Sequence, residues 1–314
     1  MIWNGTLVFD ARGPFLFFIE WHLSLSVLAK KVDAVLNFQK QENRPRVPDM
    51  FLNPYSSNTF IGNRFLRGEG GFILFSVTGM QGFVLFSPSH LFTLGLFFAV
   101  CLALVLFRER LMPYKNILKW SIFWTLVVCE VSAQSWLILT GQWEIGDLPL
   151  HLCSMSSFLA IYIFLKKSVK GFYVLYFIGT LPAILAMVTP EMSYVFPHFH
   201  YIEYFLHHSA IPIAALYFIL FEGYRVPRKA ILFTFLVVNL AAVPIFFFNL
   251  LFDTNYFYLA SPTESKTILS FFGSGILYYL NLEAAALIVF SITYAPMWQL
   301  IKMENRRKLK AIYK

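Results

Sequence analysis

Charged residues are scarce in this sequence. Asp, Glu, Lys and Arg make up 13% of its 314 residues, whereas hydrophobic residues make up 58% and aromatic residues 19%. A soluble globular domain carries roughly 25% charged residues, which cover its surface. The shortage of charge therefore argues against an ordinary soluble enzyme and indicates a protein for which lipid is the main solvent.

Cysteine is also rare, and its spacing excludes a cross-linked framework. Cys101, Cys129 and Cys153 all lie in apolar stretches, and the sequence contains no CxxC pair. Disulfide-rich and zinc-ribbon folds are therefore not expected. We interpret Cys101 and Cys129 as packing residues, because a lone buried cysteine usually behaves as a small hydrophobic side chain.

Two further classes of site lack their defining residues. A retinal-binding protein needs a Schiff-base lysine inside its last helix, and the apolar segment 273–298 has none. Several histidines, including His198 and His200, are predicted near the outer face, but no HExxH or comparable zinc-binding spacing occurs. We therefore expect neither a metal site nor a cofactor.

Seven apolar segments, each close to the length that crosses roughly 30 Å of hydrocarbon, account for the hydrophobic residues. They cover about 82–107, 117–141, 148–165, 171–189, 201–222, 229–252 and 273–298. The sequence therefore predicts an all-α membrane protein, with a bundle of seven transmembrane helices over 80–301 and a basic cytoplasmic tail over 302–314.

Residues 1–79 have a different character and contain no long apolar run. Their best apolar piece, 15–29, is too short to span, carries Glu20 and His22, and lacks the basic flank of a signal peptide. We expect a poorly structured leader or an upstream extension of the reading frame, with the natural product beginning at Met80.

Basic residues lie in alternate connections between the predicted helices. Sixteen of them belong to one set: Arg108, Arg110, Lys115, Lys119, Lys166, Lys167, Lys170, Arg225, Arg228, Lys229, Lys302, Arg306, Arg307, Lys308, Lys310 and Lys314. The other connections hold only Lys266. The positive-inside rule places the first set in the cytoplasm, so the bundle begins outside and the C-terminus lies inside. The net charge of +8 thus reflects topology, and we expect a multi-pass protein of the cell membrane that binds no nucleic acid.

Polar side chains of several predicted helices share one depth in the outer half of the membrane. At 1.5 Å per residue, Cys153 lies about 8 Å and the pair His207 and His208 about 10 Å from the outer helix ends. Gln134 has a comparable depth, and Glu130 lies one turn deeper on the same face. Further members of this layer are His90, Tyr279 and Glu283.

Ionisable groups within a bilayer cost roughly 2.5–3.5 kcal/mol each, so the layer needs a physical reason. Hydrogen bonding between helices is one interpretation, because lipid offers no partners. A reactive pair is the other, since an imidazole can take the proton of the Cys153 thiol and leave a thiolate that attacks an ester carbonyl. The sequence alone leaves both interpretations open.

Three blocks of sequence resemble one family of bacterial integral membrane proteins. They are LPLHLCS at 148–154, YIEYFLHH at 201–208 and NYFYL at 255–259. Together with Glu130 ahead of the first block, they resemble the YwaF family over about residues 80–300.

The YwaF family is similar to the eukaryotic transmembrane protein 164 group, acyltransferases that move fatty acyl chains between phospholipids through a Cys and a His. The resemblance implies that Cys153 accepts the acyl group and that His208, or its neighbour His207, is the base. Membrane phospholipids would then be the partners. Candidates for orienting the histidine or binding the lipid head are Glu130, Gln134 and His151.

A transporter is the main alternative. In a proton-coupled permease, Glu130, Glu283 and the histidines would form the translocation path. Pro182, Pro212 and Pro244, which fall inside predicted spans, would then mark broken helices. A noncatalytic scaffold or sensor is a third possibility.

Overall fold

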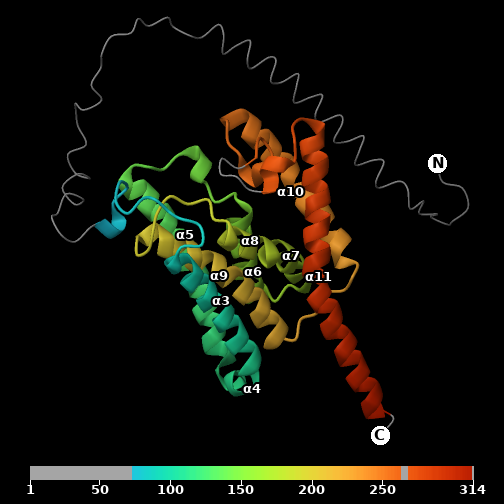
Figure 1. Ribbon diagram of the computed structural model, residues 1–314. Helices are drawn as coiled ribbons and strands as arrows, with labels where there is room; N and C mark the ends of the chain where they lie inside the picture. Colours follow the sequence, from blue (N-terminus) through green and yellow to red (C-terminus); the bar gives the residue numbers. More distant parts are fainter. Residues whose placement is uncertain (1–72, 263–267, 313–314) are drawn as a thin grey trace, which may run out of the picture. The chain divides into compact units, whose positions relative to one another are not determined.

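The computed structural model describes residues 73–262 and 268–312, and every named element in these ranges is helical (Figure 1). The α-helices are α3 (Pro88–Leu106), α4 (Arg108–Leu111), α5 (Lys115–Thr140), α6 (Leu152–Lys166), α7 (Val169–Gly179), α8 (Leu181–Val188), α9 (Phe199–Leu220), α10 (Ala230–Phe252) and α11 (Ile276–Ile312). Short 3-10 turns are η1 (Ile73–Phe75), η2 (Met112–Tyr114), η3 (Ile145–Asp147), η4 (Tyr256–Tyr258) and η5 (Ile268–Phe271).

Six helical segments of the described ranges are long and apolar enough to cross a membrane. They are Pro88–Leu106, Arg108–Thr140, Val169–Val188, Phe199–Leu220, Ala230–Phe252 and Ile276–Ala311. The prediction of a multi-pass helical membrane protein is therefore confirmed. The segment expected at 148–165 forms the shorter apolar helix α6, whose 15 residues extend about 22 Å. That length is less than the roughly 30 Å of a hydrocarbon core, so a seventh span stays a prediction.

The segment Val169–Val188 is broken near its middle. Helices α7 and α8 meet at Thr180, whose backbone angles of φ −94° and ψ −82° are not helical. Pro182 follows at the start of α8, where its missing N–H costs no helical hydrogen bond. Pro212 and Pro244 lie inside α9 and α10, which continue through them. Of the three prolines considered as helix breakers, only Pro182 adjoins a break.

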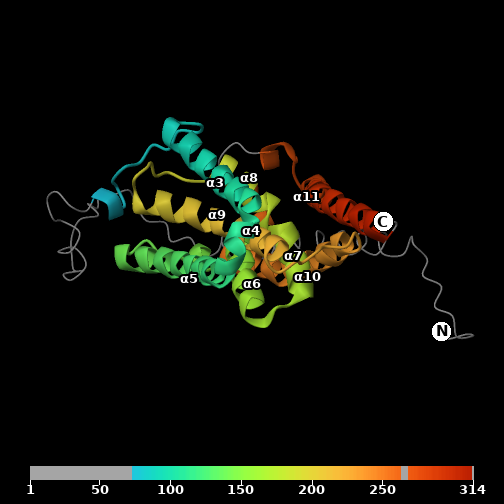
Figure 2. The same cartoon turned by 90° about the horizontal axis from the view of Figure 1, so that it is seen from below.

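Helix α9 is the central helix of the fold. In its most apolar stretch, 61% of α9 is buried inside the protein. The corresponding share is 17% for each of α3, α10 and α11. It contacts α3, α5, α6, α7 and α8, and Figure 2 shows it between α3 and α5. Small side chains permit this close packing, because Ala210, Ala214 and Ala215 are all buried on α9.

Contacts along α9 fix the directions of its neighbours. Trp136, near the end of α5, stacks on His200, near the start of α9. Glu130 lies earlier on α5 and contacts His207, which lies later on α9. These two helices are therefore antiparallel. Helix α6 is parallel to α9, since Ser157 meets His207 and Phe164 packs on Tyr217. The N-terminal ends of α6 and α9 therefore lie at the same end of the bundle.

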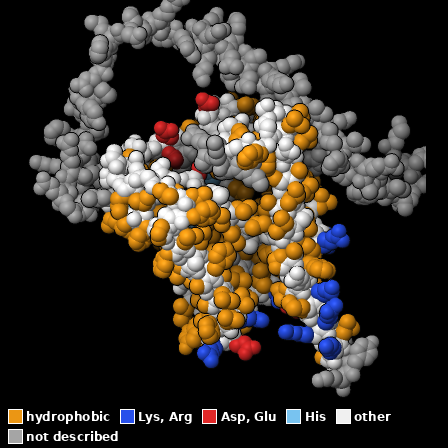
Figure 3. Space-filling view, viewed as in Figure 1, with side chains coloured by type: hydrophobic (Ala, Val, Ile, Leu, Met, Phe, Trp, Pro, Cys, Tyr) orange, Lys and Arg blue, Asp and Glu red, His pale blue; other side chains and the backbone are white. Residues whose placement is uncertain are grey.

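The four basic connections gather at one end, here called the basic end, around residues 221–229. The contacts are Lys115 Nζ with Glu222 Oε1 at 3.9 Å, the Tyr224 hydroxyl donating to the Lys167 carbonyl at 3.1 Å, and Arg225 Nε donating to both carboxylate oxygens of Glu304 at 3.1 Å. Figure 3 shows Lys and Arg side chains over α4 and the C-terminal part of α11, next to a largely hydrophobic surface. The basic connections, which alternate with less basic ones along the sequence, thus lie together at one end of the fold.

The opposite end, here called the histidine end, carries the connections with little basic charge. Val195 donates its backbone N–H to the Met80 carbonyl at 2.8 Å, and the Tyr258 hydroxyl donates to Glu191 at 3.0 Å. The expected leader falls mostly on residues 1–72, which lie outside the described residues. Its remainder, 73–79, packs at this end.

Replacing Gly179 with Ala tests the packing of α7 against α9. A Cβ atom at Gly179 would lie 2.8 Å from Ile211 Cγ2 and 2.9 Å from Leu175 Cδ1, and both side chains are fully buried. We expect Gly179→Ala to destabilise the protein by about 1–3 kcal/mol, as overpacked cores do. Thermal unfolding in detergent measures this. Gly95→Ala is the matched control, because nothing lies within 4 Å of its Cβ position, and an unchanged midpoint for Gly179→Ala would contradict the packing.

Candidate functional site

Aromatic and imidazole rings close the histidine end around the start of α9. His198 precedes the helix and accepts a hydrogen bond at Nδ1 from the backbone N–H of His200, at 3.1 Å. Its Nε2 must then carry the hydrogen, which it donates to the Ser76 carbonyl at 3.1 Å. The ring stacks on Tyr194 with centroids 4.0 Å apart, and burial lowers its pKa. His198 is thus a neutral N-cap of α9 rather than an available base.

The segment 73–83 adds further bonds to this end. Trp136 Nε1 donates to the Phe75 carbonyl at 3.0 Å, and the Tyr194 hydroxyl donates to the Val77 carbonyl at 3.1 Å. Phe75 also stacks on Phe199 with centroids 5.3 Å apart. Backbone carbonyls of residues 75–77 therefore satisfy donors from α5 and from the connection before α9.

Two of the residues predicted to orient the histidine shape the connection between α5 and α6 instead. Gln134 Nε2 donates to the Asp147 carbonyl at 2.6 Å, and its Oε1 accepts from Trp143 Nε1 at 3.0 Å. His151 Nε2 lies 3.3 Å from the Gly146 carbonyl, and burial lowers the pKa of this imidazole. Neither side chain hydrogen-bonds to Cys153, His207 or His208 in the described structure. Their expected part in substrate binding stays a prediction.

Glu130, Ser157 and His207 meet deeper in the bundle, each on a different helix. The Ser157 hydroxyl lies 2.5 Å from His207 Nε2, and Glu130 Oε1 lies 3.1 Å from the same nitrogen. All three residues are buried, Ser157 completely. The Glu130 oxygen forms no hydrogen bond with any described residue, so its contact with His207 is a close polar approach.

Composition alone would make this cluster a serine hydrolase triad, but its geometry differs. In such triads the serine and the carboxylate meet opposite nitrogens of the imidazole, so the acid holds the ring while the other nitrogen takes a proton. Here Ser157 and Glu130 both meet Nε2 of His207. The cluster therefore has the character of an anchor between helices. Sequence reasoning missed Ser157, because a serine within an apolar helix gives no periodic signal.

His208 is held differently from its neighbour. Its Nδ1 lies 2.8 Å from the Tyr204 carbonyl, and its ring stacks on the Tyr204 ring with centroids 4.0 Å apart. A carbonyl oxygen only accepts, so Nδ1 carries the hydrogen and Nε2 carries the lone pair. No described residue hydrogen-bonds to that Nε2. This nitrogen of His208 is therefore able to accept a proton.

Cys153 lies in the first turn of α6 and is half-buried. Its thiol is within electrostatic reach of the Glu130 carboxylate and of the Tyr204 hydroxyl, and Tyr204 carries the stacked ring of His208. The thiol also lies beside the backbone N–H groups of residues 153 and 154. No hydrogen bond joins it to His207 or His208 among the described residues.

The remaining polar groups of the predicted layer bond elsewhere. His90 Nε2 donates to the Met187 carbonyl at 2.8 Å, and its Nδ1 accepts from the Phe86 N–H at 3.0 Å. Asn239 on α10 donates to Glu283 on α11 at 3.1 Å. Within residues 73–262 and 268–312, no group of three His, Cys, Asp or Glu side chains has the arrangement needed to hold a metal ion.

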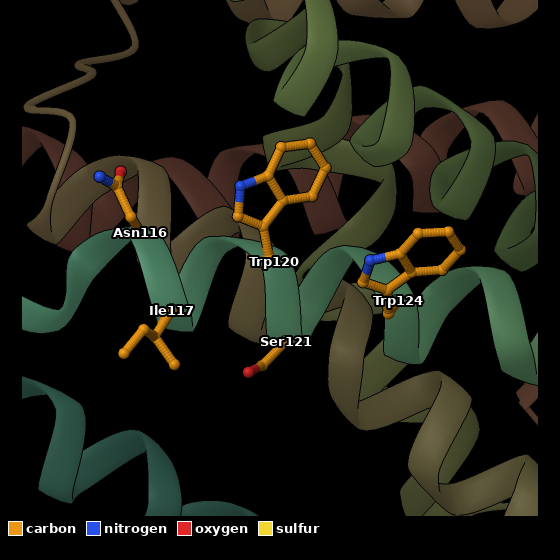
Figure 4. Close-up of a pocket in the computed structure, with 5 residues that line it drawn as sticks. All are labelled: Asn116, Ile117, Trp120, Ser121 and Trp124. Atoms are coloured by element: carbon orange, nitrogen blue, oxygen red, sulfur yellow. The ribbon is translucent and has the colours of Figure 1, made fainter.

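A shallow groove lies nearer the basic end of α5, away from this cluster (Figure 4). Its lining consists of Asn116, Ile117, Trp120, Ser121 and Trp124. Both tryptophans are exposed, and Lys119 Nζ lies 4.8 Å from the Trp120 ring centroid. Trp beside Lys is typical of the membrane–water interface, so this surface needs no ligand of its own.

The helical fold, with its six apolar helices and its buried polar cluster, defines an integral multi-pass membrane protein. The TMEM164 family model matches residues 85–294, and the chain belongs to this family. The match contains Glu130, Gln134, His151, Cys153, His207 and His208. No curated protein and no solved structure matches the chain.

The cap at His198 predicts a pH dependence of stability. Because folding lowers the pKa of this imidazole from 6.5, the unfolded chain binds more protons below that pH, and stability is lost as the pH falls through 6.5. We expect His198→Asn, which keeps an N-cap acceptor but does not titrate, to flatten this part of the curve. The check is the unfolding midpoint between about pH 5 and pH 8. Parallel curves for both proteins would exclude His198 as a contributor.

Proposed function

We propose that the protein is a Cys/His-dependent phospholipid acyltransferase or transacylase of the cell membrane. The observation that carries the proposal is the tautomer of His208, whose Nε2 is free to accept a proton. The ring leans one turn back along α9 onto Tyr204, and the Tyr204 hydroxyl is within electrostatic reach of Cys153. Membership of the TMEM164 family and the resemblance of the Cys and His blocks support the same assignment.

In the proposed reaction, an acyl group is transferred first to Cys153 and then from it to an acceptor. His208 Nε2 takes the thiol proton, and the thiolate attacks the ester carbonyl of a glycerolipid. The tetrahedral intermediate collapses to a thioester, and the departing lysolipid alkoxide takes the proton from the imidazolium. The hydroxyl of a lysolipid acceptor, or water, then attacks the thioester with His208 again as base, which restores the thiol.

The start of α6 supplies groups that suit this chemistry. The N-terminus of a helix favours negative charge, which stabilises both a thiolate and the oxyanion of the intermediate. His151, the residue before α6, makes no side-chain cap to the first turn. The N–H groups of residues 153 and 154, which lie beside the thiol, are therefore the candidate oxyanion donors.

We infer the membrane topology from the same elements. Seven spans, with α6 as the short third one, would place the basic end in the cytoplasm under the positive-inside rule. The histidine end would then face outside, and Cys153 would lie in the outer half of the bilayer. Phospholipids of that leaflet are the expected acyl donors and acceptors.

A proton-coupled transporter is the second candidate, because two observations favour it. The buried contact of Glu130 with His207 resembles the ionisable pairs of proton pathways, and the break at Thr180 resembles the discontinuous helices of transporters. Transport should tolerate Cys153→Ser and fail with Glu130→Gln. Acyl transfer through Cys153 demands the reverse order of sensitivity.

Mass spectrometry of the protein purified in native lipid tests the acyl-enzyme. We expect a hydroxylamine-sensitive acyl adduct on Cys153 and none on Cys101 or Cys129. We expect His208→Ala to slow formation of the adduct at least about 100-fold, the lower end of a general-base contribution. An unmodified Cys153 that also resists a lipid-like thiol probe would contradict the proposal.

A further inference from the structure

We propose that the bond between Ser157 and His207, with Glu130 beside it, sets the register of α6 against α9 and thereby brings Cys153 and His208 together. These three are positioning residues rather than reacting ones. The inference rests on the proposed function, because it assigns them a part in the same acyl transfer.

The first step is that the bond joins the immediate neighbours of the reacting residues. Ser157 lies one turn after Cys153 on α6, about 6 Å along the helix axis. His207 directly precedes His208 on α9. Any slide of α6 along α9 that changes the separation of Cys153 and His208 must therefore change the Ser157–His207 distance as well.

The second step is that the bond has no substitute between these helices. Among the described residues, it is the one hydrogen bond between side chains of α6 and α9. The other contacts are apolar, such as Phe164 on Tyr217 and Phe218. Apolar packing tolerates a shift of one residue, or 1.5 Å, better than a hydrogen bond of 2.5 Å, which such a shift breaks.

The third step excludes a direct chemical role for the cluster. The Ser157 side chain is fully buried, so its hydroxyl cannot meet a lipid ester without opening the bundle. His207 Nε2 meets two side chains of other helices at once, and Nδ1 of His208 meets a carbonyl of its own helix. We therefore assign the anchoring role to His207, and His208 keeps the role of base that the proposed function gives it.

Glu130 extends the anchor to a third helix. Its carboxylate reaches the same His207 nitrogen from α5, which runs antiparallel to α9. Both side chains are buried, where the dielectric constant is low, so a carboxylate and an imidazole interact more strongly than they do at a surface. The cluster thus joins three helices at one level, one turn along α6 from Cys153.

The test compares Ser157→Ala with Ser156→Ala in the full chain. Ser156 is equally buried on α6, but its hydroxyl donates only to the Leu152 carbonyl of its own helix, at 2.7 Å. The readout is the rate at which the Cys153 adduct forms, over a range of donor lipid concentrations and of pH. We expect Ser157→Ala to lower kcat by about 10- to 100-fold, the effect of a misplacement near 1 Å, with KM within about twofold.

The pH profile separates positioning from catalysis. Since His208 stays the base, Ser157→Ala should keep the shape of the wild-type profile, whereas His208→Ala should change it. Ser156→Ala should match the wild type, and equal unfolding midpoints for both serine variants would show that the loss is not one of folding. Where Ser157→Ala unfolds, Ser157→Thr, which keeps the hydroxyl, should retain the wild-type kcat within about threefold, less than half a decade.

Three results would overturn the inference: a wild-type rate in Ser157→Ala, an equal loss in Ser156→Ala, or a profile that changes with His207→Ala and not with His208→Ala. None of these would disprove acyl transfer, since each requires an adduct on Cys153. Absence of any adduct in the wild-type protein would instead mean that the proposed function itself has failed.

Discussion

A helix with imidazoles and carboxylates at the centre of an apolar bundle must find its hydrogen-bond partners inside the protein. Lipid offers none, and an unsatisfied polar group at that depth costs several kcal/mol. Helix α9 is under this constraint, because it is the most buried span and carries His200, Glu203, His207 and His208. The partners of His207 and His208 come from α5, from α6 and from the backbone of α9, whereas Glu203 pairs with His200 on α9 itself. The arrangement of the surrounding helices follows from those pairings.

The constraint also explains why two adjacent histidines have different environments. Residues in sequence on a helix point about 100° apart, so His207 faces α5 and α6 while His208 folds back over Tyr204. One ring is engaged by side chains of other helices and the other by a carbonyl of its own helix. A doublet of this kind can separate the tasks of holding a bundle together and of exchanging a proton.

Much of the fold could be predicted from the sequence, because the bilayer sets both the length of each apolar segment and the side on which basic connections lie. The predicted apolar segments correspond to helices, and the basic connections meet at one end. The short length of α6 was beyond that reasoning, since residues 148–151 of the expected span lie before the helix, and His151 is extended. The hydrogen-bond partners of individual side chains were harder still to predict. Gln134 and Ser157 have roles that depend on which helix lies opposite, and a hydropathy pattern carries no such information.

The bonds at residues 75–77 have a consequence for how the histidine end is closed. Trp136, Tyr194 and His198 each give a hydrogen to a carbonyl of this short stretch. These three acceptors lie outside the family-matched region, which begins at residue 85. Each donor left without a partner costs about 1–3 kcal/mol where water cannot replace it. Residues 75–77, which precede the matched region, therefore help to close the histidine end of the bundle.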